Sequence, residues 1–207
     1  MNIISNNCAG SFYLRMKGFM FENPFVWCSI TPIDTINLIR YYDKLDFNNF
    51  EIIEMPLLTY PNNTLIQEKL KKNKILGIKI DNKITIWFTH YLEKIKNEKY
   101  DECDLLVEDL HSFIKEKYIE RVKRIKESPL FLILPYDFNN WTENDKIVLS
   151  KLESKYKIIL FNDREIPHAK NVELIITDLN DGNPRRIIEK HFNEINQAIF
   201  GKDITQK

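Results

Sequence analysis

The hydrophobic and polar positions of this chain follow two rhythms, one typical of buried strands and the other of amphipathic helices. Short continuous apolar runs predict buried strands at 3–4, 130–134, 158–161 and 172–176. Helical spacing of apolar residues lies between them, most clearly over 102–126 and in a final helix that ends at Gly201. Buried strands joined by helices predict an α/β fold whose mostly parallel sheet is covered on both faces.

Residues 75–90 form the clearest hairpin pattern. Apolar and polar positions alternate along its second arm, and the turn at 81–83 contains an Asp-Asn pair that tolerates the left-handed backbone of tight turns. We therefore expect a three-layer α/β/α architecture with one antiparallel hairpin added. Residues 1–207 are expected to form a single domain, with 202–207 as a frayed tail.

The composition is that of a globular protein and argues against several functions. The 30 basic residues are balanced by 30 acidic ones, which disfavours nucleic acid as a partner. Only five glycines occur, and neither GxGxxG nor GxxxxGK[ST] is present, so no glycine-rich phosphate loop is expected. No apolar run reaches the ~18 residues that would indicate a membrane span, so we expect no integral membrane segment.

The cysteines and histidines give no metal or disulfide pattern. The three cysteines are widely spaced and form no CxxC pair, which fits a reducing compartment and predicts a cytoplasmic protein: Cys8, Cys28 and Cys103. The four histidines have no metal-ligand spacing, so neither a metal nor another cofactor is expected. Three of them are expected at exposed positions without a role: His111, His168 and His191.

Cys8 is the most informative residue of the chain. It follows the apolar pair 3–4 by three polar residues and precedes an expected helix, which indicates a strand-to-helix turn with the thiol at the helix start. Unpaired N–H groups and the helix dipole would favour a thiolate and lower the thiol pKa there. Asn6 and Asn7 could cap the helix or donate hydrogen bonds to an oxyanion. Alternatively, Cys8 is a small buried side chain without reactivity.

Three polar residues follow expected strands and form a coherent catalytic set. They are Cys8, His90 and Asp137, and the sites of open α/β sheets lie at such strand ends. The histidine would take the thiol proton, the carboxylate would fix its tautomer, and the thiolate would attack an acyl carbon. Asp163 competes with Asp137 for the third role. Either His90 or Asp137 could instead be structural, as a hydrogen-bonded strand residue or a turn residue.

Two arginines lie in the last turns of the long helix expected at 102–126. Arg121 and Arg124 could bind a phosphate or carboxylate of a substrate, because guanidinium groups pair well with both. They could equally be a solvated helix face.

Several motifs together resemble the bacterial family called domain of unknown function nineteen-nineteen. They are the Ser-Asn-Asn-Cys opening at 5–8, the Asn-Pro-Phe at 23–25, the His-Tyr pair at 90–91, and the spaced arginines of 120–125 before the strand 130–134. The resemblance covers residues 3–162. This chain departs from the family at 9–11, where Ala-Gly-Ser replaces Trp-Gly-Gly, and at Tyr118, where the family tends to have Trp.

A second family, described as papain-like cysteine peptidases, is similar in other positions. The similarity lies in Leu14-Arg15, in the Pro-Phe-Val-Trp of 24–27, and in the spacing of Tyr118, Arg121 and Arg124. Val26 stands where that family has Asp, so any carboxylate role at this point is lost. Both families keep the cysteine and the later histidine, which implies that Cys8 and His90 act together. The resemblance also adds Arg15 to the expected substrate-binding residues.

The resemblance implies a role in exopolysaccharide or capsule biosynthesis, and a small-molecule or glycan-precursor substrate. The leading hypothesis is a cytoplasmic enzyme with a Cys8 nucleophile and a His90 base, catalysing acyl transfer or hydrolysis on a cell-surface polysaccharide precursor. One alternative is a transferase that binds a sugar-linked phosphate through Arg121 and Arg124. Another is a non-catalytic partner in polysaccharide assembly. The acyl group and the oligomeric state stay open at this point.

Overall fold

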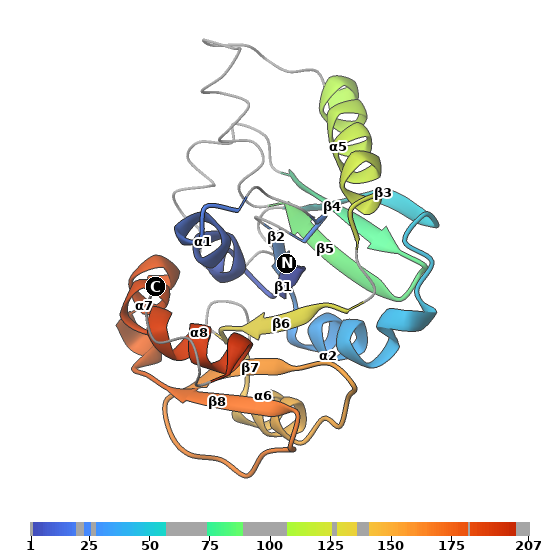
Figure 1. The fold of residues 1–207 in the computed structure, drawn as a ribbon. Coiled ribbons are helices and arrows are strands. Elements are labelled where there is room, and N and C mark those ends of the chain that lie inside the picture. Colours follow the sequence, from blue (N-terminus) through green and yellow to red (C-terminus); the bar gives the residue numbers. More distant parts are fainter. Residues whose placement is uncertain are drawn as a thin grey trace.

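Two four-stranded sheets organise the fold (Figure 1). The computed structural model describes residues 2–19, 23–25, 28–56, 74–88, 107–125, 128–135, 141–181 and 183–201. The parallel sheet has the order β1-β6-β7-β8, with bounds Ile3–Ser5, Leu130–Ile133, Ile158–Asn162 and Val172–Ile176. The antiparallel sheet has the order β2-β5-β4-β3, with bounds Cys28–Ile30, Ile84–Phe88, Lys74–Ile80 and Phe50–Pro56.

Helices cover both faces of the parallel sheet, which confirms the three-layer α/β/α prediction. Successive strand residues point to opposite faces, and Ile3 and Ile4 accordingly belong to different apolar clusters. One face is covered by α1 (Ala9–Met16), α7 (Pro184–Lys190) and α8 (Phe192–Phe200). The other is covered by α2 (Pro32–Tyr41) and α6 (Glu143–Ser150).

The antiparallel part is larger than the single hairpin that we expected. The hairpin itself is confirmed, and its turn residues Asp81 and Asn82 have positive φ angles of 49° and 54°. The strand β2 pairs with β5, with Cys28 opposite Phe88, and β3 pairs with β4. Apolar alternation identifies a strand but not its partner, so this pairing was not readable from the sequence.

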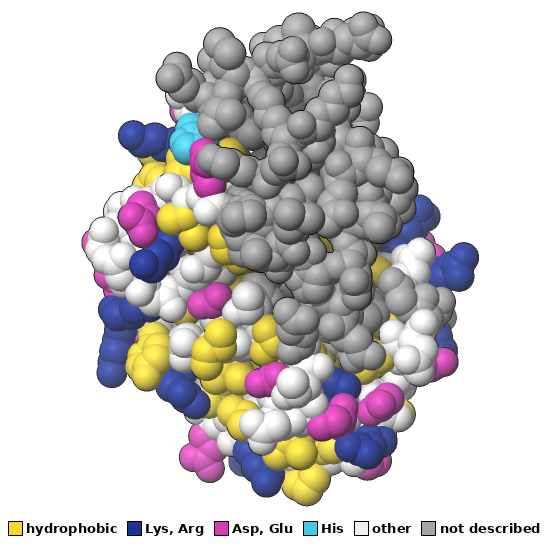
Figure 2. Space-filling model, turned by 180° about the vertical axis from the view of Figure 1, so that it is seen from behind, with side chains coloured by type: hydrophobic (Ala, Val, Ile, Leu, Met, Phe, Trp, Pro, Cys, Tyr) yellow, Lys and Arg dark blue, Asp and Glu magenta, His cyan; other side chains and the backbone are white. Residues whose placement is uncertain are grey.

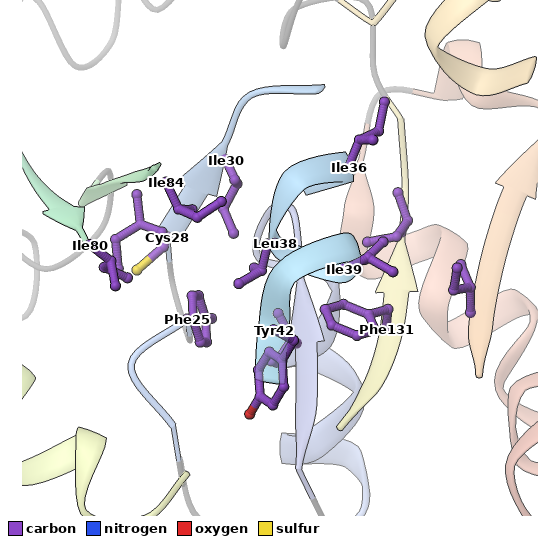
Figure 3. Close-up of a cluster of buried hydrophobic side chains, with 14 of the residues drawn as sticks. Phe25, Cys28, Ile30, Ile36, Leu38, Ile39, Tyr42, Ile80, Ile84 and Phe131 are labelled. Carbon is purple, nitrogen blue, oxygen red and sulfur yellow. The ribbon is translucent and has the colours of Figure 1, made fainter. Parts of the chain in front are cut away.

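A shared apolar core joins the two sheets. Figure 3 shows part of it, in which Ile30 and Ile84 of the antiparallel sheet lie with Ile39 of α2 and Phe131 of the parallel sheet. The single-domain expectation stays a prediction, and the expected tail at 202–207 lies outside the described residues.

The long helix is α5 (Val107–Val122), the central part of the expected 102–126. It packs on β3 through Tyr118, whose ring centroid lies 4.5 Å from that of Phe50 and whose hydroxyl donates to the Phe47 carbonyl at 3.0 Å. Short 3-10 helices follow α2 at Tyr42–Lys44 and precede α7 at Leu179–Asp181. In the described part of the chain, no helix combines the length and apolarity needed to cross a bilayer.

The expected final helix is divided at His191 into α7 and α8. His191 is also buried, with 5% of its surface exposed, so the expectation that this histidine is exposed is wrong. Its Nε2 lies 3.0 Å from Thr177 Oγ1 and its Nδ1 lies 2.8 Å from Glu194 Oε2. The side chain thus connects the end of β8 to the junction of the two helices.

Candidate functional site

Cys8 lies directly after β1 and immediately before α1, as the sequence predicts. Its backbone is already helical, with φ −70° and ψ −2°, and its side chain is half-buried. Gly10 allows α1 to start this close to the strand, because a Cβ there would lie 2.9 Å from Ser5 Cβ and 3.3 Å from Ile3 Cγ2. A similar strand-turn-helix presents the nucleophile of α/β-hydrolases at a sheet edge.

Asn6 and Asn7 hold this turn against the end of β6. Asn6 Nδ2 donates to the Leu134 carbonyl at 3.1 Å, and Asn6 Oδ1 accepts from the Leu134 N–H at 2.9 Å. Asn7 Nδ2 donates to the same carbonyl at 2.7 Å, and its Oδ1 accepts from Ala9 N–H at 2.9 Å. The N-cap position of α1 is Cys8, which makes no side-chain cap hydrogen bond, so Asn7 contributes a bond to the first helical N–H from the residue before the cap. Because both amide nitrogens donate to Leu134, the first-turn N–H groups of α1 are the better oxyanion donors.

The topology gives Cys8 a position where ligands are expected. Helix α1 packs on one face of the parallel sheet, whereas the chain that follows β6 reaches α6 on the opposite face. Neighbouring parallel strands whose connections leave to opposite faces define a topological switch point, and open α/β sheets bind ligands at the carboxyl ends of such strands. The Cys8 turn lies at that edge, between β1 and β6.

The surroundings of Cys8 raise the pKa of its thiol to about 12. Desolvation by burial is the main cause and outweighs a backbone hydrogen bond that favours the thiolate. The expected lowering of this pKa at the helix start is therefore wrong, because burial of the thiol depends on tertiary contacts that no local sequence pattern reveals. A nucleophilic role requires a base that takes the proton as the sulfur reacts.

The two expected partners of Cys8, His90 and Asp137, lie outside the described residues, as does Cys103. The neighbouring strand register is nevertheless informative. The strand β5 ends at Phe88, opposite Cys28 at the start of β2, whereas Ile30 at the end of β2 donates its N–H to the Asn6 carbonyl at 2.9 Å. Because β5 runs antiparallel to β2, Ile86 lies opposite Ile30, and the described end of β5 at Phe88 lies two strand residues, about 7 Å, further from the Cys8 turn along the sheet.

The two arginines of the expected substrate site, Arg121 and Arg124, lie close enough that, besides burial, the charge of Arg124 lowers the pKa of Arg121, but they differ in burial. Arg121 is half-buried beside Cys28, and burial lowers the pKa of its guanidinium. Burial also raises the pKa of the Cys28 thiol, an effect that the positive charge of Arg121 opposes. Arg124 is exposed and pairs with Glu120. The expected phosphate site at these two arginines stays a prediction.

The remaining expected residues lie on the surface. Arg15 is exposed in the last turn of α1, and Asp163 is exposed directly after β7. Basic and acidic side chains are interspersed over the described part of the face in Figure 2. Within the described ranges, no three or more His, Cys, Asp and Glu side chains gather in a way that could hold a metal ion.

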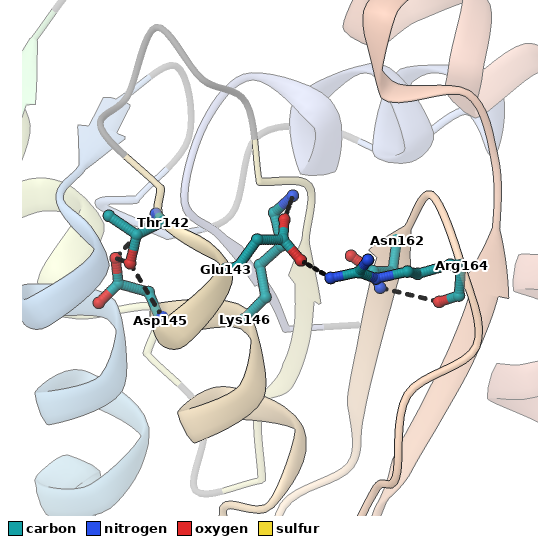
Figure 4. Close-up of polar contacts among 6 residues, drawn as sticks. All are labelled: Thr142, Glu143, Asp145, Lys146, Asn162 and Arg164. Carbon is teal, nitrogen blue, oxygen red and sulfur yellow. Dashed lines mark hydrogen bonds and ion pairs between the residues drawn. The ribbon is translucent and has the colours of Figure 1, made fainter.

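A charged cluster that the sequence did not reveal lies at the end of β7 and the start of α6 (Figure 4). Glu143 accepts from Lys146 Nζ at 2.7 Å and from Arg164 at 2.6 Å, and Asn162 Nδ2 donates to the Arg164 carbonyl at 2.8 Å. We call these four residues the Lys146 cluster. The sequence indicates the start of α6, because Thr142 and Asp145 form a capping box. It does not indicate that this helix start meets the end of β7.

Comparison with known proteins gives similarity without a function. No family model matches the chain. The chain is similar to an uncharacterized protein of Haemophilus influenzae, with 29% identity over 176 residues that cover 84% of this chain and 68% of the relative. This similarity extends over most of the fold, and the name of the relative states no activity.

Proposed function

We propose that Cys8 is the nucleophile of an acyl-transfer or hydrolysis reaction. The observation that carries the proposal is the placement of its half-buried thiol at the start of α1, at the switch point between β1 and β6. The hydrogen bonds of Asn6 and Asn7 to Leu134 fix that placement.

The raised thiol pKa defines the chemistry of the step. A base removes the thiol proton while Sγ attacks the acyl carbon, so that a thioester forms and the leaving group departs with the proton. First-turn N–H groups of α1 stabilise the oxyanion. Water or an acceptor hydroxyl then attacks the thioester and returns Cys8 to the thiol. His90 is the proposed base and Asp137 its partner, with Asp163 as the alternative, on the evidence of the sequence pattern.

The substrate class rests on the family resemblance. We further propose that a cell-surface polysaccharide precursor donates or receives the acyl group. The reaction would take place in the cytoplasm. This part of the proposal depends on the motif at 5–8 and the His-Tyr pair at 90–91.

Trapping of an acyl-enzyme tests the proposal. The protein is incubated with p-nitrophenyl acetate, quenched in acid and mapped by mass spectrometry. We expect the acetyl group on Cys8 in the wild type and in the Cys28→Ala variant, and none at this position in Cys8→Ala. Cys28 is the matched control because it is the other described free cysteine and is buried, with its Sγ 3.2 Å from the Pro24 carbonyl. An unmodified Cys8 in folded protein, or equal ester hydrolysis by Cys8→Ala, contradicts the proposal.

A further inference from the structure

Lys146 is a buried cation with few protein partners. Only 4% of its surface is exposed, although it lies in the first turn of a helix at the edge of the fold. Among the described residues, Glu143 is the acceptor for its ammonium group. Glu143 also pairs with Arg164, and its hydrogen bond to Lys146 lowers the pKa of its carboxyl group. Two cations therefore share one carboxylate, which leaves one net positive charge in the Lys146 cluster.

Asn162 adds a buried acceptor to the cluster. The residue is fully buried at the end of β7, and its Nδ2 donates to the Arg164 carbonyl. No described residue donates to its Oδ1. An unsatisfied buried acceptor is costly, and it is retained where a ligand or another group supplies the missing hydrogen bond.

The strand register places this cluster within reach of Cys8. The strand β7 lies beside β6, with Leu160 opposite Ile133, and β6 lies beside β1. The Cys8 turn contacts Leu134 at the end of β6, and Asn162 ends the next strand. Ser5 at the end of β1 is in register with Ile159, three residues before the end of β7. The Cys8 turn continues past Ser5 to Leu134, so about two strand spacings, about 10 Å, separate this turn from Asn162. A ligand the size of a monosaccharide with one charged substituent spans that distance.

We infer that the Lys146 cluster binds the anionic, hydroxyl-bearing part of the substrate whose acyl group reacts at Cys8. The inference rests on the proposed function for its link to Cys8, but the cluster itself points to the ligand. The uncompensated charge on Lys146 and Arg164 selects a phosphate or carboxylate. The Oδ1 atom of Asn162 accepts from a donor on the ligand. With the glycan precursor of the proposed function supplying hydroxyl groups, the ligand class is a phosphorylated or carboxylated polyol.

Calorimetric titration of the Cys8→Ala variant tests the ligand class without turnover. The probes are glucose 1-phosphate, glucuronate, glucose and inorganic phosphate. We expect one of the two anionic sugars to bind at least about tenfold more tightly than glucose, the loss expected when a charged partner is left unpaired. Preference for glucose 1-phosphate identifies a phosphorylated ligand, and preference for glucuronate a carboxylated one. Glucose binding as tightly as both, inorganic phosphate matching the sugars, or no binding by any probe overturns the inference.

Variants of the cluster test its location. We expect Arg164→Gln and Lys146→Met each to weaken binding of the preferred sugar by about tenfold. Arg185→Gln is the control for Arg164→Gln, since both arginines form exposed pairs with a glutamate, at 66% and 63% side-chain exposure. If Lys146→Met fails to fold, Arg164→Gln against its control decides alone. Binding that is unchanged by Arg164→Gln, or weakened equally by Arg185→Gln, overturns the inference.

The two proposals fail in different ways. If sugar binding depends on Arg164 but Cys8 is not acetylated, the result supports a ligand site at the cluster and contradicts the proposed acyl transfer at Cys8. If Cys8 is acetylated but no sugar binds, the result supports Cys8 as the nucleophile and contradicts the Lys146 cluster as a substrate-binding site.

Discussion

The Cys8 turn and the Lys146 cluster lie at the same edge of one parallel sheet but are held by different interactions. The turn is held by neutral amides on backbone groups, and burial raises the pKa of its thiol to about 12. The cluster is held by ion pairs, which lower the pKa of Glu143 and keep its carboxylate charged. The comparison teaches that neutral buried hydrogen bonds position a reactive group, whereas the charged groups beside them are suited to ligand recognition.

The largest effect that we expect is on the alkylation of Cys8. With a thiol pKa near 12, the thiolate fraction at neutral pH is about a thousandfold below that of a free cysteine. Residue-resolved mass spectrometry of iodoacetamide labelling should show a correspondingly slow rate that rises about tenfold per pH unit through pH 10. A plateau below pH 8 that disappears in His90→Ala would instead show a resting thiolate paired with this histidine.

Substitution of Asn6 should break the Cys8 turn. Asn6→Ala removes both hydrogen bonds to Leu134 and leaves a buried backbone N–H and C=O with fewer partners. We expect a loss of about 3 kcal/mol in the free energy of unfolding, measured by urea denaturation. The control is Asn171→Ala, which removes two hydrogen bonds at a partly buried site remote from this turn in the sequence. An equal or larger loss in the control would mean that the hydrogen bonds of Asn6 contribute no more to the free energy of unfolding than those of Asn171.

Gly10→Ala tests the close approach of α1 to β1. The added Cβ would lie 2.9 Å from Ser5 Cβ, so we expect a loss of about 2 kcal/mol despite the better helix propensity of alanine. Gly18→Ala is the comparison, because its Cβ meets nothing within 4 Å and only its φ of +72° opposes the change. Thermal unfolding of both variants should rank Gly10→Ala as the more damaging, and the reverse order would remove the steric argument.

The smallest effect on stability is expected in the Lys146 cluster. Arg164→Gln removes an exposed ion pair with Glu143, and such pairs contribute at most about 1 kcal/mol. We expect a change below about 0.5 kcal/mol in urea denaturation, together with the tenfold loss of sugar binding given above. A large loss of stability would show that this arginine serves the fold and would weaken the contrast between the two regions.

Much of the architecture was predictable because it depends on local patterns. The strands expected at 130–134, 158–161 and 172–176 are β6, β7 and β8 to within a residue or two. Thr31 accepts from Asp34 N–H at 3.2 Å with Pro32 in the first turn, as the order of these residues indicates. The pairing of β2 with β5 was not predictable, because a short apolar run fits either kind of sheet.

The candidate site was predictable only in its first residue. The order of residues 3–10 identified a thiol at a helix start, and the structure confirms this position. The Lys146 cluster was missed because its members come from a helix start and from the end of a strand sixteen and more residues later in the chain. His191 was assigned to the surface because a histidine between two helical patterns carries no signal of burial.

The sequence by itself determined which segments become strands and helices, where α1 and α2 begin, and that Cys8 stands at a helix start. Those features follow from periodicity and capping, which involve residues within one or two turns of each other. The tertiary structure alone decided the thiol pKa, the burial of His191 and the meeting of Lys146, Arg164 and Asn162 around Glu143. Desolvation and charge proximity depend on residues that are distant in the chain, so no local pattern encodes them.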